Sequence, residues 1–102
     1  MRASIAAAAI LLTAGTASGG DLRARVESAP KAVAAFIQRR ADCDHFLGEE
    51  PYDKQRAADL ARTVRELRCD GLDLDERKLR RTFKNKAQIL KLLDETGASI
   101  DW

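Results

Sequence analysis

The stretch that decides the fold is RRADCDHFLGEEPYD, residues 39–53, because a helix that enters it meets two residues that interrupt helices, Gly48 and Pro51. Upstream, Ser28 is a candidate cap and Pro30 suits the first turn of a helix. A helix from about Pro30 then has one apolar face, on which residues recur at three- and four-residue steps: Val33, Phe36, Ile37, Ala41 and Phe46. Lys31, Gln38, Arg39, Arg40 and Asp42 are predicted to face water.

Downstream of this stretch, residues 53–68 give the clearest helical pattern in the chain. Its apolar face is formed by Ala57, Leu60, Ala61, Val64 and Leu67, and charged residues occupy the other faces. Gly71 follows shortly after, and we expect it to end this helix in a left-handed conformation.

Two further helices are predicted toward the end of the sequence. Asp73 and Glu76 have the spacing of a capping box, and Leu79 and Phe83 then lie one turn apart on an inner face. Asn85 and Gln88 repeat the box before the apolar residues of the last helix, Ile89, Leu90, Leu92 and Leu93, and Gly97 supplies its stop. A break at residues 84–86 is therefore expected, although one continuous helix stays open. No segment alternates in the way a strand does, so the predicted fold class is all-α, a bundle of three to four short helices.

The two cysteines, Cys43 and Cys69, constrain this bundle. In a straight hairpin that turns at residues 48–51, Cys43 lies about one turn from the bend and Cys69 roughly 25 Å from it, too far for a disulfide. Either the thiols stay free, or the first helix ends near Cys43 and residues 44–52 extend for up to roughly 30 Å before the chain returns. We expect the second geometry, because free thiol pairs rarely persist in oxidising compartments. The bridge is expected to contribute roughly 3 kcal/mol.

The N-terminal residues indicate export. Arg2 is followed by an apolar stretch, residues 3–12, and by small residues up to Gly20, the layout of a cleavable signal peptide. The stretch is shorter than the roughly 20 residues that a spanning helix needs, so we expect no stable membrane insertion after cleavage. The predicted organisation is a signal peptide over residues 1–20 and one helical domain over residues 21–102, with residues 21–28 as a frayed lead-in. A periplasmic or secreted location follows.

The charge of the mature chain excludes one class of partner. Loss of Arg2 leaves 17 basic against 16 acidic residues, a formal charge of about +1. Nucleic-acid-binding domains are usually strongly basic, so we expect no nucleic-acid partner. A domain of about 80 residues has a small core, which is a further reason to expect a disulfide. The oligomeric state is left open.

Several features of this chain resemble a group of small uncharacterised exported proteobacterial proteins. They are the string Cys43, Asp44, His45, Phe46, Leu47, Gly48, Glu49, the later Cys69, and a basic helix that leads into a short terminal helix. The group carries a Cys-x-His-aromatic-x-Gly-Glu pattern, and the resemblance covers residues 36–93. It implies a disulfide-linked helical fold and transfers no catalytic residue.

The same string also contains the candidate chemistry. Cys43, His45, Glu49 and Cys69 are residue types that bind zinc, but their spacing fits no common zinc site and a disulfide excludes thiolate ligands. His45 and Glu49 also suggest an acid–base pair, yet no nucleophile or phosphate loop accompanies them. We therefore expect no metal, no cofactor and no catalysis, and a structural or binding role of unknown kind for His45, Phe46, Gly48 and Glu49. Asp70, Asp73, Asp75 and Glu76 lack the order of a calcium loop.

The densest run of charge gives the candidate contact surface. It spans residues 77–86 and includes Arg77, Arg80, Arg81 and Lys84, which we take as the candidate binding residues. A solvated face, balanced within the molecule by Asp42, Asp44, Glu49, Glu50 and Asp53, is the alternative. The sequence thus predicts a non-catalytic exported protein that binds another protein, as an inhibitor or accessory factor. An anionic envelope or membrane-surface binder and a small enzyme or metal site around His45 are the alternatives.

Overall fold

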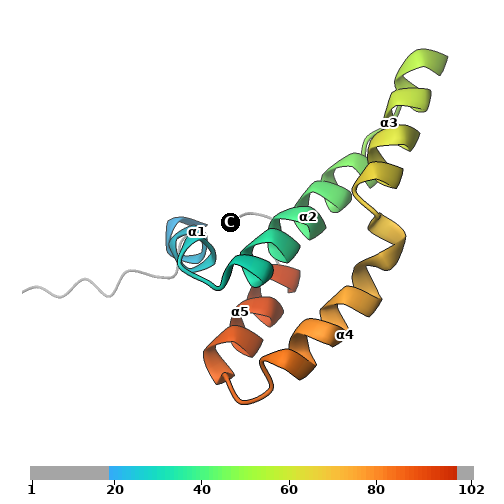
Figure 1. The fold of residues 1–102 in the computed structure, drawn as a ribbon. Coiled ribbons are helices and arrows are strands. Elements are labelled where there is room, and N and C mark those ends of the chain that lie inside the picture. The colour runs from blue at the N-terminus through green and yellow to red at the C-terminus, as the bar shows by residue number, and fades with distance from the viewer. Residues whose placement is uncertain (1–18, 99–102) are drawn as a thin grey trace, which may run out of the picture.

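The computed structural model describes residues 19–98, and most of them are helical (Figure 1). The predicted signal peptide lies almost wholly outside the described residues. Within the described part there is no strand, which confirms the all-α class. The elements are, in order, α1 (Gly19–Glu27), α2 (Lys31–Leu47), α3 (Lys54–Glu66), the 3₁₀ turn η1 (Cys69–Gly71), α4 (Leu72–Thr82) and α5 (Ala87–Ala98).

The helix α2 is the centre of the molecule, because α1, α3, α4, α5 and η1 all contact it. Its predicted apolar face is confirmed: Val33, Phe36 and Ile37 are buried. They form one core with Val26 of α1 and with Leu92 and Leu93 of α5, and Leu72, Leu79, Phe83 and Ile89 pack against its edge. Burial of each large apolar side chain contributes about 1.5–3 kcal/mol, so this core is the main source of stability.

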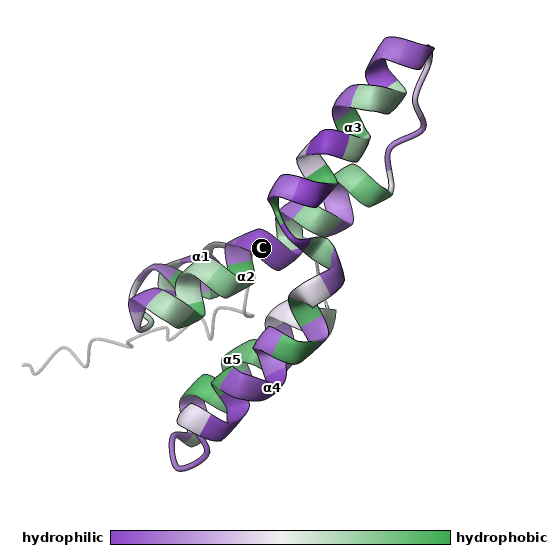
Figure 2. Cartoon of the chain, turned by 45° about the vertical axis from the view of Figure 1, so that its right-hand side comes forward, coloured by the Kyte–Doolittle hydropathy of each residue, from purple (hydrophilic) through white to green (hydrophobic). Residues whose placement is uncertain are grey.

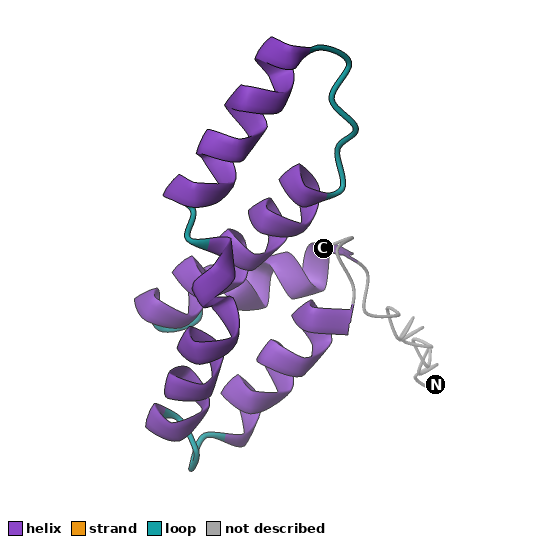
Figure 3. Cartoon of the chain, turned by 90° about the vertical axis from the view of Figure 1, so that its right-hand side faces the viewer, coloured by secondary structure: helices purple, strands orange, loops and turns teal. Residues whose placement is uncertain are grey.

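A disulfide-linked hairpin extends beyond this core. We call residues 44–68 the arm: the last turn of α2, the connection 48–53, and α3. The arm points away from α1, α4 and α5, and α3 packs chiefly on α2 and η1 (Figures 1 and 3). No arm residue belongs to the core, and Leu60 is the buried residue of α3. The arm is thus held to the body of the protein through few contacts.

The predicted disulfide forms. The Cα atoms of Cys43 and Cys69 lie 5.7 Å apart, and Cys43 is fully buried. The expectation that the first helix ends near Cys43 is wrong, since α2 continues for one more turn to Leu47. The extended connection is instead confined to residues 48–53. At about 3.3 Å per residue it carries the chain about one α3 length beyond the end of α2, so that α3 descends to bring Cys69 level with Cys43.

Arg40 was expected to face water, and the structure places it between three helices. Its side chain is 13% exposed and donates to Glu76 of α4 at 2.9 Å. It also donates to the carbonyl of Leu93 and the hydroxyl of Thr96 in α5, at 2.9 and 2.8 Å. Gly97 does not end α5, which continues to Ala98. A Cβ there would lie 3.3 Å from this guanidinium, so the glycine gives it room.

The other expected helix ends differ in the structure. Residues 21–28 are not a frayed lead-in but lie largely in α1, and the hydroxyl of Ser28 donates to the carbonyl of Ala24 instead of capping α2. The left-handed residue after α3 is Arg68, with φ 56°, whereas Gly71 has φ −96°. The left-handed conformation is unfavourable for a residue other than glycine. At Arg68 a hydrogen bond from Arg39 to the backbone carbonyl, at 3.3 Å, holds it in place.

Two capping boxes were predicted, and neither forms as expected. α4 begins at Leu72 after Gly71, without a side-chain cap, and Glu76 binds arginines instead. α5 begins at Ala87, and its first hydrogen bonds run to the carbonyl of Lys86. The predicted break between these helices is nevertheless confirmed, because α4 ends at Thr82 and residues 83–86 make the turn.

We predict that loss of the disulfide acts first on the arm. The bridge spans 26 positions of sequence, so replacing both cysteines by alanine is expected to lower the free energy of unfolding by about 3 kcal/mol. In hydrogen exchange, the amides of α3 are expected to lose protection before those of α2. Reduction of the unsubstituted protein is the control, because it breaks the bridge without changing a residue. Equal protection of α3 in the oxidised and reduced protein would contradict this prediction.

Candidate interaction surfaces

The far end of the arm is held by two local interactions. The carboxylate of Asp53 caps α3 by accepting from the amide of Arg56 at 2.7 Å. The guanidinium of Arg56 then donates to both carboxylate oxygens of Glu49, at 2.5 and 2.8 Å. This paired geometry ties the connection to the first turn of α3, so the chain between Glu49 and Asp53 is fixed at both ends.

Large apolar side chains are exposed along the arm, one at the end of α2 and one just before α3. Tyr52 is 82% exposed and Leu47 is 62% exposed, and they are two of the most exposed large apolar residues of the described chain. Two exposed carboxylates, Asp44 and Glu50, lie close to them in sequence and make no ion pair with a described residue. We call Asp44, Leu47, Glu50 and Tyr52 the acidic tip. An exposed tyrosine beside unpaired charges is typical of a protein contact.

The structure separates the members of the predicted string. Cys43 lies in the disulfide, and His45 is exposed, with its ring edge-to-face against Phe46 at 5.0 Å. Gly48 ends α2, where its amide donates to the carbonyl of Asp44 at 3.1 Å, with φ −87°. Its backbone conformation is one that any residue adopts, although a Cβ at this position would lie 3.2 Å from the carbonyl oxygen of Asp44.

Glu49 is paired with Arg56, and this pairing argues against its role in an acid–base pair with His45. Its hydrogen bonds from Arg56 hold the pKa of the carboxyl below the ordinary value of 4.5, and the charge of His45 lowers it a little further. A carboxylate held in this way is a poor proton acceptor near neutral pH. The two bridged cysteines also offer no thiolate to a metal, and among residues 19–98 no group of three or more His, Cys, Asp or Glu side chains is placed to hold one.

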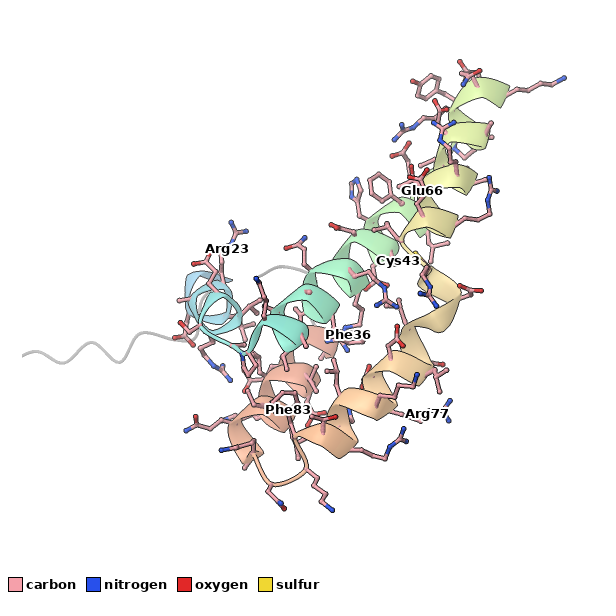
Figure 4. All side chains as sticks on the ribbon, in the orientation of Figure 1. Arg23, Phe36, Cys43, Glu66, Arg77 and Phe83 are labelled. Atoms are coloured by element: carbon pink, nitrogen blue, oxygen red, sulfur yellow. A yellow bond between two sulfur atoms is a disulfide. The ribbon has the colours of Figure 1, made fainter. Side chains whose placement is uncertain are left out.

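The predicted basic surface on α4 divides into two parts. Arg80 points into the molecule's own ion pairs, at 2.9 Å from Glu76 and 2.7 Å from Asp94 of α5. Arg77 and Arg81 are exposed and make no ion pair within the described chain, and the same holds for Lys84 in the following turn. Figure 4 shows Arg77 on the outer side of α4, whereas Phe36 and Phe83 lie toward the other helices.

The exposed part of α4 has a regular pattern. Leu74, Arg77, Lys78 and Arg81 recur at three- and four-residue steps, so they share one side of the helix, which we call the basic face. Leu74 is 50% exposed. Figure 2 shows hydrophilic and hydrophobic residues alternating along α4. The sequence pattern singled out the charges of this face but gave no role to Leu74.

The acids that were expected to neutralise the basic run do not pair with it. Of the acids expected to neutralise the basic run, Glu49 binds Arg56, Asp53 caps α3 and Asp42 accepts from Gln38. The acids that do pair with α4 are Glu76 and Asp94, and they engage Arg80. Arg77 and Arg81 therefore make no ion pair with the described residues, whereas Lys78 lies near enough to Asp75 to help lower the pKa of that carboxyl.

The sequence pattern placed Arg39 and Arg40 on the water-facing side of the helix, so the roles of both arginines were missed. Arg39 donates to Asp75 of α4 at 2.7 Å and lowers the pKa of that carboxyl. This pair lies at a shallow groove of about 320 Å³ between α2 and α4, which Phe36 and Leu79 also line. A signal was present, since Arg39 and Arg40 stand three and four residues after the buried Phe36, next to the core, and both guanidinium groups lie over its ring.

Comparison of the chain with protein-family models, with curated proteins and with solved structures finds no match. None of the helices within residues 19–98 has the length and apolar character needed to cross a membrane.

We predict that the Glu49 carboxyl titrates below 4.5 and that Arg56 is the reason. Because the folded pKa is lowered, the stabilisation is present above the ordinary pKa and is lost as pH falls through the folded one. Titration of side-chain carboxyl carbons by NMR measures this directly. In an Arg56→Gln variant the pKa of Glu49 is expected to return toward 4.5. An unchanged pKa in that variant would show that the ion pair is not the cause.

Proposed function

We propose that this chain is an exported, non-catalytic interaction protein that binds a partner protein through the acidic tip of its arm. The observation that supports this most directly is the exposure of Tyr52 and Leu47 on a disulfide-linked hairpin. Tyrosine carries much binding energy at protein interfaces, because it offers a large rigid surface at low entropic cost. A role as an inhibitor or accessory factor is consistent with such a tip.

The order of the tip supports the same proposal. The Glu49–Arg56 pair and the Asp53 cap fix the segment that carries Tyr52, so little conformational entropy is lost when a partner binds it. Export is supported by the signal-like N-terminal sequence and by the disulfide, which persists in oxidising compartments. The periplasm or the medium is the location that we propose.

Site-specific photo-crosslinking tests this proposal. A photoreactive residue at position 52 is expected to give a discrete protein adduct in the envelope of the producing cell. The same residue at Gln88, an exposed position on α5 outside the arm, is expected to give none. A competing Tyr52→Ala protein in excess is expected to leave the adduct intact, whereas excess unsubstituted protein is expected to remove it. Equal adducts at both positions, or none at position 52, would refute the proposal.

A second function is favoured by one observation, the unpaired charge on α4. Arg77, Arg81 and Lys84 are exposed and free of ion pairs within the described chain, which suits an anionic envelope or membrane surface. Arg80 is omitted from this proposal, because its ion pairs with Glu76 and Asp94 join α4 to α5.

Vesicles with anionic headgroups distinguish this function. An Arg77→Glu/Arg81→Glu variant is expected to lose at least tenfold in vesicle affinity, and salt of about 0.5 M is expected to weaken binding of the unsubstituted protein. A Lys31→Glu/Arg65→Glu variant has the same net charge, changes exposed residues elsewhere, and is expected to bind normally. If the two variants bind alike, the basic face is not an anionic-surface site.

A further inference from the structure

The acidic tip and the basic face are complementary in charge and similar in composition. Along the tip, the carboxylates of Asp44 and Glu50 alternate with Leu47 and Tyr52, and the face has Leu74 followed along one helical side by three cations. Each surface thus combines exposed apolar area with unpaired charge, and the two charges are opposite. Asp44 and Glu50 of the tip and Arg77 and Arg81 of the face make no ion pair with the described part of their own chain.

The two surfaces cannot meet within one molecule. The arm and α4 extend in opposite directions from η1, as Figures 1 and 3 both show. The disulfide fixes the base of the arm beside the buried Cys43, and α3 descends along α2 toward η1. Because the arm is held in this direction, its tip stays at the far end from the α4–α5 turn.

We propose that the acidic tip of one copy docks on the basic face of a second copy of this chain. Tyr52 covers Leu74, and Glu50 and Asp44, which precede Tyr52 along the arm, meet Arg77 and Arg81. An antiparallel pair brings each tip to the other copy's α4, so that two equivalent contacts form and the buried area doubles. The inference rests on the proposed function, because it names the partner that the tip binds.

The charges give this contact its specificity. Opposite charges at the rim of an apolar contact guide association and reject a wrong orientation, in which like charges would face each other. Because these side chains are exposed, the contact is expected to weaken with salt. The residues concerned make no ion pairs in the described chain and lie outside the core, so they can be exchanged without loss of the fold.

A charge-exchange experiment tests the proposal, with sedimentation equilibrium of the mature full-length protein as the measurement. The unsubstituted protein is expected to be a dimer that dissociates in high salt. The tip variant Asp44→Lys/Glu50→Lys and the face variant Arg77→Glu/Arg81→Glu are each expected to be monomeric, because both contacts then join like charges. An equimolar mixture of the two variants is expected to restore the dimer, since both contacts are again between opposite charges.

Two controls make the result decisive. Circular dichroism of each variant confirms that it is folded, and Lys31→Glu/Arg65→Glu, with the net charge of the face variant, is expected to remain dimeric. A monomeric unsubstituted protein at millimolar concentration overturns the proposal, as does a mixture that associates no better than its components.

The same measurements separate this inference from the proposed function. A monomer whose position 52 crosslinks to a different protein overturns the second copy as partner and leaves the tip as a binding site. An adduct with twice the mass of the mature chain supports both. A monomer with no adduct overturns both.

Discussion

The disulfide between Cys43 and Cys69 is the constraint on which the arrangement of this small protein depends. Cys43 is completely buried on the central helix, and Cys69 begins the turn from which α4 departs, so one bond fixes where the arm ends and where the second half of the bundle begins. The arm has few buried residues of its own, and α3 packs chiefly on α2 and η1. Noncovalent burial at this level rarely holds a hairpin in one orientation, and the covalent bond supplies what the packing lacks.

The packing of α4 and α5 on α2 depends on a different interaction, the hydrogen bonds of the Arg40 guanidinium. A core of six buried apolar residues does not by itself fix how α4 and α5 sit on α2, since apolar contacts carry little directional information. The hydrogen bonds from Arg40 to Glu76, to the Leu93 carbonyl and to Thr96 are directional, and they join all three helices at one point. Arg80 extends this network from Glu76 to Asp94. Glu76 and Asp94 thus orient the helices through Arg40 and Arg80, and for this reason they do not pair with Arg77 or Arg81.

Sequence reasoning predicted the parts of the fold that follow from local periodicity and chain geometry. The apolar faces of α2 and α5, the break before α5 and the disulfide with an extended connection are of this kind. It failed where a long-range partner decides. Glu76 has capping-box spacing but binds Arg40, Gly97 resembles a helix stop but makes room for the same guanidinium, and Arg68 adopts the left-handed conformation expected of Gly71. For the candidate surfaces, the run of basic residues on α4 was visible in the sequence. That Arg80 is unavailable to a partner could not be seen there, because it depends on an ion pair with Asp94, fourteen residues away.

The positions of the exposed charges that lack an ion pair follow from these two interactions together. Inside the body, arginines and carboxylates are matched, and at the far end of the arm Glu49 is matched with Arg56. The charges without an ion pair include Asp44 and Glu50 beyond the disulfide and Arg77 and Arg81 on α4, although the mature chain as a whole is expected to be nearly neutral. A near-neutral chain gains little from long-range attraction to a charged partner, so association must depend on local patches at short range. Such patches favour a partner that presents both charges at a fixed distance, and a second copy of the same chain does so by construction.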